Sequence, residues 1–138
     1  MAIEKGSTIR RFETGATRDR ADTKLNFEGF LSPLVLEKFA EYMHRHRNQA
    51  DGNLRDADNW QKGIPIPVYM ESLWRHFFDV WKVIRGLESR EGLDEATCGA
   101  MFNLMGMYHE ILKMQRGLAQ PEGKEYISTH HPEGFREF

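Results

Sequence analysis

Apolar side chains recur at helical spacing in three stretches of the chain, at residues 34–47, 68–85 and 93–113. In the first stretch, Leu36, Phe39, Ala40 and Met43 fall at i, i+3, i+4 and i+7, which is the spacing of one helix face. A Ser-Pro pair precedes it, and proline is favoured at the first position of a helix. The pattern therefore predicts three α-helices.

The stretch at 68–85 differs from the other two because bulky apolar residues lie nearly all the way round it. They are Leu73, Trp74, Phe77, Phe78, Val80, Trp81 and Ile84. A helix that is apolar on every side is normally buried. We therefore expect it to be the central helix of an all-α protein, a small bundle of three to five helices. Val, Ile and Thr total only 17 residues, which is few for a protein built on sheets.

The remaining segments are expected to form an arm, a loop and a tail. The connection at 48–67 is far longer than the usual loop of about 4–6 residues. Trp60 within it favours an ordered loop. Residues 1–30 are expected to form an extended arm, and residues 118–138 a loose tail. Because no internal repeat interrupts this order, the prediction is a single domain over 1–138.

Charge and composition narrow the possible partners. The 138 residues include 19 Lys+Arg and 21 Asp+Glu, so the net charge of −2 argues against a partner that is a nucleic-acid polymer. The single cysteine, Cys98, excludes an internal disulfide framework and a cysteine-based zinc site. No apolar run approaches 18 residues, and we expect no membrane partner and a cytoplasmic location.

Two pairs of polar residues share one spacing. His76 and Asp79 lie three apart on the second predicted helix, so their side chains share a face. A buried carboxylate needs a cation, a metal ion or several hydrogen-bond donors. Glu41 and His44 repeat the spacing on the first helix, and the two pairs together could hold a metal ion between helices. The alternatives are a polar network around Asp79 and, for Glu37, Glu41 and His44, a solvated helix face.

The third predicted helix carries Asn103 and Glu110 on one line with Gly106 between them. Gly99 and Gly106 each cost roughly 1 kcal/mol relative to Ala inside a helix. We interpret them as places where a neighbouring helix or a flat ligand approaches closely. His109 is expected to be a core histidine.

The loop and the arm supply candidate nucleotide contacts. Trp60 can stack on a base, Asn59 can read its edge, and Arg55 or Lys62 can meet phosphate oxygens. The alternative for Trp60 is a packed position in the core. In the arm, Arg18 and Lys24 are further donors, a weaker signal because any polar arm contains such residues.

Five strings carry a resemblance: ETGATRD (13–19), GFLSPLVLEKFAEYMHRHR (29–47), DNWQKGIP (58–65), SLWRHFFDVW (72–81) and FNLMGMYHE (102–110). They resemble the phage family of dATP/dGTP diphosphohydrolase N-terminal domains over about residues 10–115. The resemblance implies a MazG-like all-α fold and hydrolysis of a purine deoxynucleoside triphosphate to monophosphate and diphosphate. MazG-like enzymes hold divalent cations with ExxE and ExxD motifs. Here the matching spacings are Glu41-x-x-His44 and His76-x-x-Asp79, so His replaces one carboxylate in each.

The resulting hypothesis is a metal-dependent hydrolase for dGTP or dATP. Glu41, His44, His76 and Asp79 would hold the metal, and Glu37 or Glu110 would accept the proton of the attacking water. Mg²⁺ prefers oxygen ligands, whereas the histidines also admit Mn²⁺, Co²⁺, Fe²⁺ or Zn²⁺. The substrate contacts would be Arg18, Lys24, Arg55, Asn59, Trp60, Lys62, Arg75 and Asn103.

A site on two helices would be open on one side, which further predicts a homo-oligomer, a dimer or tetramer. Some of the chain's many aromatic side chains are expected at its interface. Two other functions stay open at this point. One is a phage nucleotide sponge that sequesters a signalling nucleotide without hydrolysing it, in which the histidines and Asp79 are structural. The other is a metal-dependent phosphohydrolase of different chemistry, related in logic to HD-domain enzymes, although the chain has no adjacent His-Asp pair.

Overall fold

The computed structural model describes residues 9–20 and 23–117. The chain divides into two compact units, Met1–Pro33 and Leu34–Phe138, which are described separately. The first unit covers the predicted arm. The predicted tail, residues 118–138, lies outside the described residues.

The first unit contains a small antiparallel hairpin. Strand β1 (Ile9–Arg11) pairs with β2 (Thr17–Asp19) in the register Arg10 opposite Arg18. The turn closes through the amide of Phe12, which donates to the carbonyl of Ala16 at 3.0 Å. This hairpin corrects the all-α prediction, because the described chain is mostly helical with one two-stranded sheet. Strands of three residues are too short to show a period in the sequence.

A single helical turn, α1 (Phe27–Phe30), follows in the first unit. It begins at Asn26, whose side-chain oxygen accepts a hydrogen bond from the amide of Gly29 at 2.9 Å. This side-chain cap satisfies one of the amides that a helix start leaves without a backbone partner.

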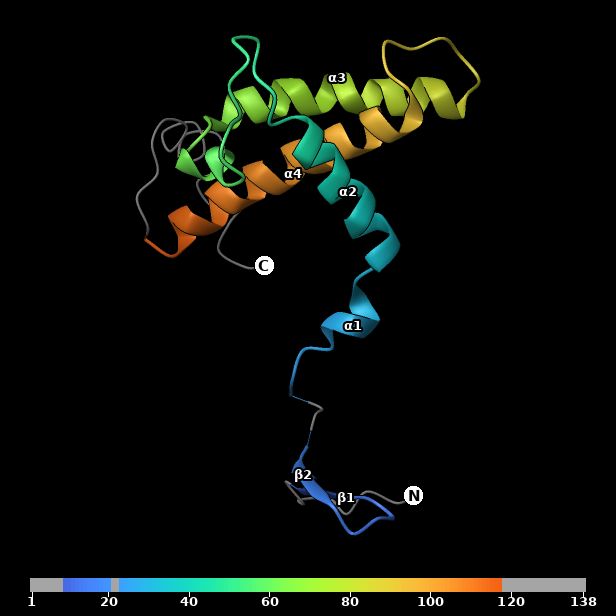
Figure 1. Ribbon diagram of the computed structural model, residues 1–138, viewed down its shortest axis with the longest axis vertical. Helices are drawn as coiled ribbons and strands as arrows, with labels where there is room; N and C mark the ends of the chain where they lie inside the picture. The colour runs from blue at the N-terminus through green and yellow to red at the C-terminus, as the bar shows by residue number, and fades with distance from the viewer. Residues whose placement is uncertain (1–8, 21–22, 118–138) are drawn as a thin grey trace. The chain divides into compact units, whose positions relative to one another are not determined.

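The described part of the second unit, up to residue 117, is built from three helices and a short 3-10 turn (Figure 1). They are α2 (Pro33–Arg45), η1 (Asn59–Lys62), α3 (Ile66–Ile84) and α4 (Leu93–Gln115). The predicted helices at 34–47, 68–85 and 93–113 agree with these bounds to within two residues at each end. Helices α3 and α4 pack side by side as an antiparallel hairpin.

Two glycines on α4 let the ring-bearing side chains of α3 approach its backbone. A Cβ atom at Gly99 would lie 2.6 Å from Nδ1 of His76, and one at Gly106 would lie 2.6 Å from the hydroxyl oxygen of Tyr69. His76 and Tyr69 are seven residues apart, as are the two glycines, so the same contact recurs every two turns along the helix pair. The interpretation of these glycines as sites of close helix approach is confirmed.

Helix α3 is not buried on every side, contrary to the sequence prediction. It buries Ile66, Tyr69 and Asp79, whereas Trp74 and Trp81 are exposed. The reason is that α4 is the only described helix with which α3 shares an extensive packed surface. No helix in the described part of the chain is long and apolar enough to cross a membrane.

Candidate functional site

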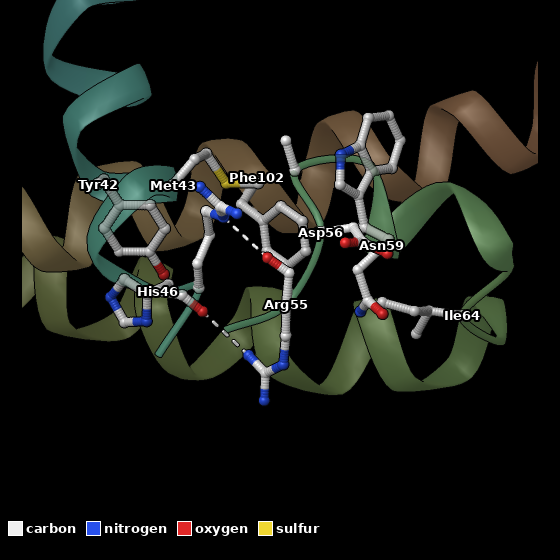
Figure 2. Close-up of a pocket in the computed structure, with 11 residues that line it drawn as sticks. Tyr42, Met43, His46, Arg55, Asp56, Asn59, Ile64 and Phe102 are labelled. Atoms are coloured by element: carbon white, nitrogen blue, oxygen red, sulfur yellow. Dashed lines mark hydrogen bonds between the residues drawn. The ribbon is translucent and has the colours of Figure 1, made fainter. Parts of the chain in front are cut away.

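A pocket of about 360 Å³ lies in the second unit, where the end of α2, the loop before α3 and the middle of α4 come together (Figure 2). Its volume falls within the usual range for small-molecule sites, about 300–1,000 Å³. We call it the loop pocket. It is lined by Tyr42, Met43, His46, Arg47, Arg55, Asp56, Ala57, Asn59, Trp60, Ile64 and Phe102.

The loop that forms one side of this pocket is held by its own hydrogen bonds. The amide of Gln49 donates to the carbonyl of Asn53 at 3.0 Å, across a turn in which Gly52 has a φ of +85°. The carboxylate of Asp51 accepts from the amide of Asn53 at 3.0 Å, which together with the Asn53 side chain lowers the pKa of Asp51. These bonds agree with the predicted order of the loop.

Two arginines in the pocket wall tie the loop to the end of α2. Arg47 Nε donates to the carbonyl of Arg55 at 2.8 Å, and Arg55 Nη1 donates to the carbonyl of His46 at 3.1 Å (Figure 2). The amide of Arg55 also donates to the carbonyl of Arg47 at 2.7 Å. A guanidinium carries five N–H donors, and each of these side-chain bonds uses one of them. Both groups therefore keep donors for an anion while their positions are fixed.

Aromatic rings form other parts of the wall. The Trp60 ring packs edge to face against His109 of α4, with ring centroids 4.8 Å apart, so the loop is anchored on that helix. Tyr42 lies against His46 with ring centroids 4.1 Å apart, and burial together with the charge of Glu95 raises the pKa of Tyr42 to about 12. The Trp60 ring both packs against α4 and lines the pocket, so the two alternatives given for it in the sequence analysis do not exclude each other.

Glu95 at the start of α4 connects the pocket to the helix hairpin. Its carboxylate lies 3.0 Å from His46 Nε2 and forms an ion pair with Arg45. The hydrogen bond from His46 and then that from Arg45 hold the pKa of Glu95 below its usual value. This network fixes the end of α2 against α4 and orients the His46 ring at the pocket edge.

The four predicted metal ligands do not meet in this structure. Glu41 and His44 lie exposed on α2, as does the predicted base Glu37. On α3, Asp79 accepts hydrogen bonds from Arg90 Nη2 at 2.7 Å and Nε at 3.0 Å, and His76 Nδ1 lies 2.9 Å from Glu91. Among the described residues, no three His, Cys, Asp or Glu side chains gather closely enough to hold a metal ion.

The arrangement around Asp79 is the polar network that the sequence left open as the alternative. Asp79 is buried, and the hydrogen bond from Arg90 holds its pKa below the usual value of an aspartate. Both partners, Arg90 and Glu91, come from the connection between α3 and α4. Asp79, through Arg90, and His76, through Glu91, thus hold that connection in place and do not form a site with α2.

Glu110 and Asn103 lie in the α3–α4 hairpin, and neither lines the loop pocket. Asn103 Nδ2 donates to the carbonyl of Gly99 at 2.7 Å. Glu110 is fully buried, with Oε1 3.1 Å from Lys113 Nζ. Within the described structure, its Oε2 atom and the hydroxyl of Tyr69 have no hydrogen-bond partner. Burial, with the charge of Glu110, raises the pKa of Tyr69 to about 12.

The predicted substrate contacts separate into two groups. Arg55, Asn59 and Trp60 line the loop pocket, and Lys62 lies beside it, 3.8 Å from the carboxylate of Asp56. The others lie elsewhere: Arg18 is in β2, Lys24 is in the first unit, Arg75 pairs with Glu71 on the surface of α3, and Asn103 is buried.

Sequence reasoning missed eight pocket residues: Tyr42, Met43, His46, Arg47, Asp56, Ala57, Ile64 and Phe102. A signal for two of them was present, because Tyr42 and His46 are four apart and share a helix face next to the long loop. Phe102 offered no such signal, since it lies more than 30 residues after the loop and Met101, Leu104 and Met105 beside it on α4 are also apolar.

Comparison with known proteins adds no relative. No family model matches the chain, and neither a curated protein nor a solved structure is significantly similar to it. The resemblance to the phage diphosphohydrolase family therefore stays a prediction.

Proposed function

We propose that the chain binds a purine nucleotide in the loop pocket. The observation that carries this proposal is the joint presence of Trp60, Asn59, Arg47 and Arg55 around one cavity of about 360 Å³. An aromatic face, an amide and guanidinium groups are the side chains that recognise a base and a phosphate. The arginines are held in place by backbone carbonyls, which lowers the entropy cost of ordering them on a ligand.

In this proposal each wall of the pocket has one role. The indole of Trp60 stacks on the purine, and the amide of Asn59 reads its edge. Arg47 and Arg55 donate to phosphate oxygens. His46, held by Glu95, lies beside the arginines at the pocket edge.

The predicted four-residue metal site is not needed for this binding. Asp79 and His76 already have the partners Arg90 and Glu91, which supports a structural role for both. The function favoured by this arrangement is sequestration of a nucleotide, the alternative that the sequence analysis kept open.

Hydrolysis to monophosphate and diphosphate is the second candidate, and one observation favours it. The carboxylate of Asp56 lines the same pocket as the two arginines. Mg²⁺ is usually held by only one or two carboxylates together with the substrate's phosphates. Asp56 and a triphosphate would therefore hold the ion without Glu41, His44, His76 or Asp79. The ion would neutralise charge on the phosphates while water attacks the α-phosphorus and diphosphate leaves.

Calorimetric titration with dGTP, dATP and GTP tests the binding. Arg47→Gln is expected to weaken binding by about 10- to 100-fold, since a charged hydrogen bond contributes about 1.5–3 kcal/mol. Trp60→Leu should weaken it similarly. Arg75→Gln is the matched control, because Arg75 lies on α3 and does not line the pocket. Heat of binding absent for every nucleotide would reject the proposal.

Chromatography of the products separates the two functions. Intact nucleotide recovered after incubation with Mg²⁺ or Mn²⁺ supports sequestration. Diphosphate plus monophosphate supports hydrolysis, and Asp56→Asn should then abolish turnover while it preserves binding. Turnover that persists in Asp56→Asn but disappears in Asp79→Asn would instead support the metal site predicted from the sequence.

A further inference from the structure

One face of α3 is apolar and exposed along about three turns. Trp74, Phe77, Phe78, Trp81 and Ile84 are 66%, 55%, 48%, 53% and 68% exposed. Together with Val80 they surround a hollow of about 490 Å³. We call this set the α3 apolar face. It lies apart from the loop pocket, since no residue of α3 lines that pocket.

The size of this face is at the upper limit of what a monomer normally exposes. A buried aromatic side chain covers roughly 150–250 Å², so the exposed fractions correspond to on the order of 600 Å² per chain. The largest apolar patch on a typical monomer is about 300–600 Å². Two such faces placed together would bury on the order of 1,200 Å², which reaches the lower limit of stable protein interfaces.

The spacing of the face fits a second helix. Trp74, Phe77, Trp81 and Ile84 recur at intervals of three, four and three residues, the seam of a two-helix coiled coil. A second copy of α3 offers the same seam. A twofold axis brings the same patch of each copy together, so this one face on each chain is sufficient to form the interface.

Charges at the two ends of the face select the direction of the partner helix. Glu71, Phe78 and Arg85 lie on one line at steps of seven residues, so this line begins with an acidic residue, which pairs with Arg75, and ends with a basic one. Lys82 adds to the basic end, where its Nζ lies 5.2 Å from the centroid of the Phe78 ring. Parallel helices would place like charges side by side, whereas antiparallel helices place Glu71 of each copy near Arg85 of the other.

We propose that the α3 apolar face is covered by a second copy of this chain, with the two α3 helices antiparallel across a twofold axis. In this arrangement Trp74 faces Ile84 of the partner and Phe77 faces Trp81 of the partner. The proposal does not rest on nucleotide binding, because the two surfaces share no residue. It specifies the face and the direction that the general prediction of a homo-oligomer lacked.

Sedimentation equilibrium of the full chain, with its variants, tests the contact. The wild-type chain is expected to be dimeric at micromolar concentration. Trp81→Ser should raise the dimer dissociation constant at least about a hundredfold, since buried interface tryptophans are among the strongest contributors to binding. Trp60→Phe, outside the face, is the control and should leave the constant unchanged. A monomeric wild-type chain, or a dimer that Trp81→Ser does not weaken, would overturn the proposal.

A charge exchange tests the direction without disturbing the apolar contacts. In the antiparallel arrangement, Glu71→Arg and Arg85→Glu each place like charges together and should raise the dissociation constant about tenfold. The double variant restores opposite charges and should recover the wild-type value. Circular dichroism confirms that each variant is folded. Single variants without effect, or a double variant as weak as either single one, would overturn the antiparallel arrangement.

Discussion

The missing side chain at position 106 determines how closely α3 and α4 approach. A Cβ atom there would lie 2.6 Å from the hydroxyl oxygen of Tyr69, and the ring cannot move away because Tyr69 is almost fully buried. Gly106→Ala gains up to about 1 kcal/mol of helix propensity, but overpacking a core typically costs about 1–3 kcal/mol. We therefore expect a net loss of stability, measured by urea unfolding.

Gly92→Ala is the control for this substitution. Gly92 precedes α4, and no atom lies within 4 Å of a Cβ added there. Its effect on the free energy of unfolding should remain below about 1 kcal/mol. If Gly106→Ala proves more stable than the wild-type chain, the packing of Tyr69 against α4 is looser than described.

The pair formed by Asp79 and Arg90 makes stability depend on pH in a defined direction. Arg90 holds the pKa of Asp79 below its ordinary value of about 3.9. A lowered pKa means that the ionised carboxylate stabilises the folded state above pH ~4, and that this stabilisation is lost as the pH falls through the folded-state pKa. Asp79→Asn should lower the melting temperature by several degrees at pH 7, and this difference should narrow as the pH is lowered below about 4.

Melting curves of Asp79→Asn and Arg90→Gln across this pH range provide the measurement. Both variants remove the same ionic interaction, so their differences from the wild-type chain should narrow together as the pH falls. Glu95, whose pKa is also lowered, is intact in both variants and contributes equally to every curve. A difference that stays constant between pH 3 and 7 would show that ionisation of Asp79 does not contribute.

At the scale of elements, the helical period of the apolar residues was sufficient to predict α2, α3 and α4, but not which residues they contact. The period places His76 and Asp79 on one face of α3, yet their partners Glu91 and Arg90 lie 15 and 11 residues further along. Spacing rules for one helix cannot show such contacts, because the connection after α3 must first turn back. The same lack of partner information led to the prediction that α3 is buried on all sides.

The loop pocket was partly predictable for a related reason. Trp60, Asn59 and Arg55 were found because planar and cationic groups concentrate in an unusually long loop. Phe102 and His46 enter the pocket from α4 and α2, and their positions depend on how those helices meet the loop. Chain segments distant in sequence build the second half of this site, so local patterns identify only the first half.

The loop depends on its arginines, which gives a prediction at the scale of this element. Arg55→Ala removes the hydrogen bond to the carbonyl of His46, and a charged donor of this kind contributes about 1.5–3 kcal/mol. The amides of Gln49 and Arg55 should therefore exchange their hydrogen about 10- to 100-fold faster. The amides of α3 and α4 should keep their rates.

Hydrogen exchange followed by mass spectrometry measures both regions in one experiment. Arg75→Ala serves as the matched control, since its contacts with Glu71 and Ser72 lie on α3. Unchanged exchange in the loop of Arg55→Ala would show that the turn around Gly52 is stable without this side chain. Faster exchange throughout the chain would show general unfolding instead.

For the molecule as a whole, the buried apolar set is small beside the exposed one. The buried hydrophobic residues in the described structure are Tyr42, Ile66, Tyr69, Ala96, Cys98 and Ile111. Large apolar residues of α3 remain outside this set, including both of its tryptophans. The tryptophan and phenylalanine side chains of α3 therefore lie at the surface. This distribution is typical of chains whose stability depends on association.

Nucleotide binding and association should contribute to thermal stability through separate residues. A ligand that binds only the folded state stabilises it by about 2.7 kcal/mol at a hundredfold excess over its dissociation constant. Association likewise makes the melting temperature rise with protein concentration. Arg47→Gln is expected to remove most of the shift caused by dGTP and to preserve the dependence on protein concentration. Trp81→Ser should do the reverse, because Arg47 lines the loop pocket and Trp81 lies on the α3 apolar face.

Differential scanning fluorimetry over a series of protein and dGTP concentrations separates the two effects. If Trp81→Ser also removed the dGTP shift, the pocket would require the dimer, and the two surfaces would be coupled through α4, which packs on α3 and carries Phe102 in the pocket wall.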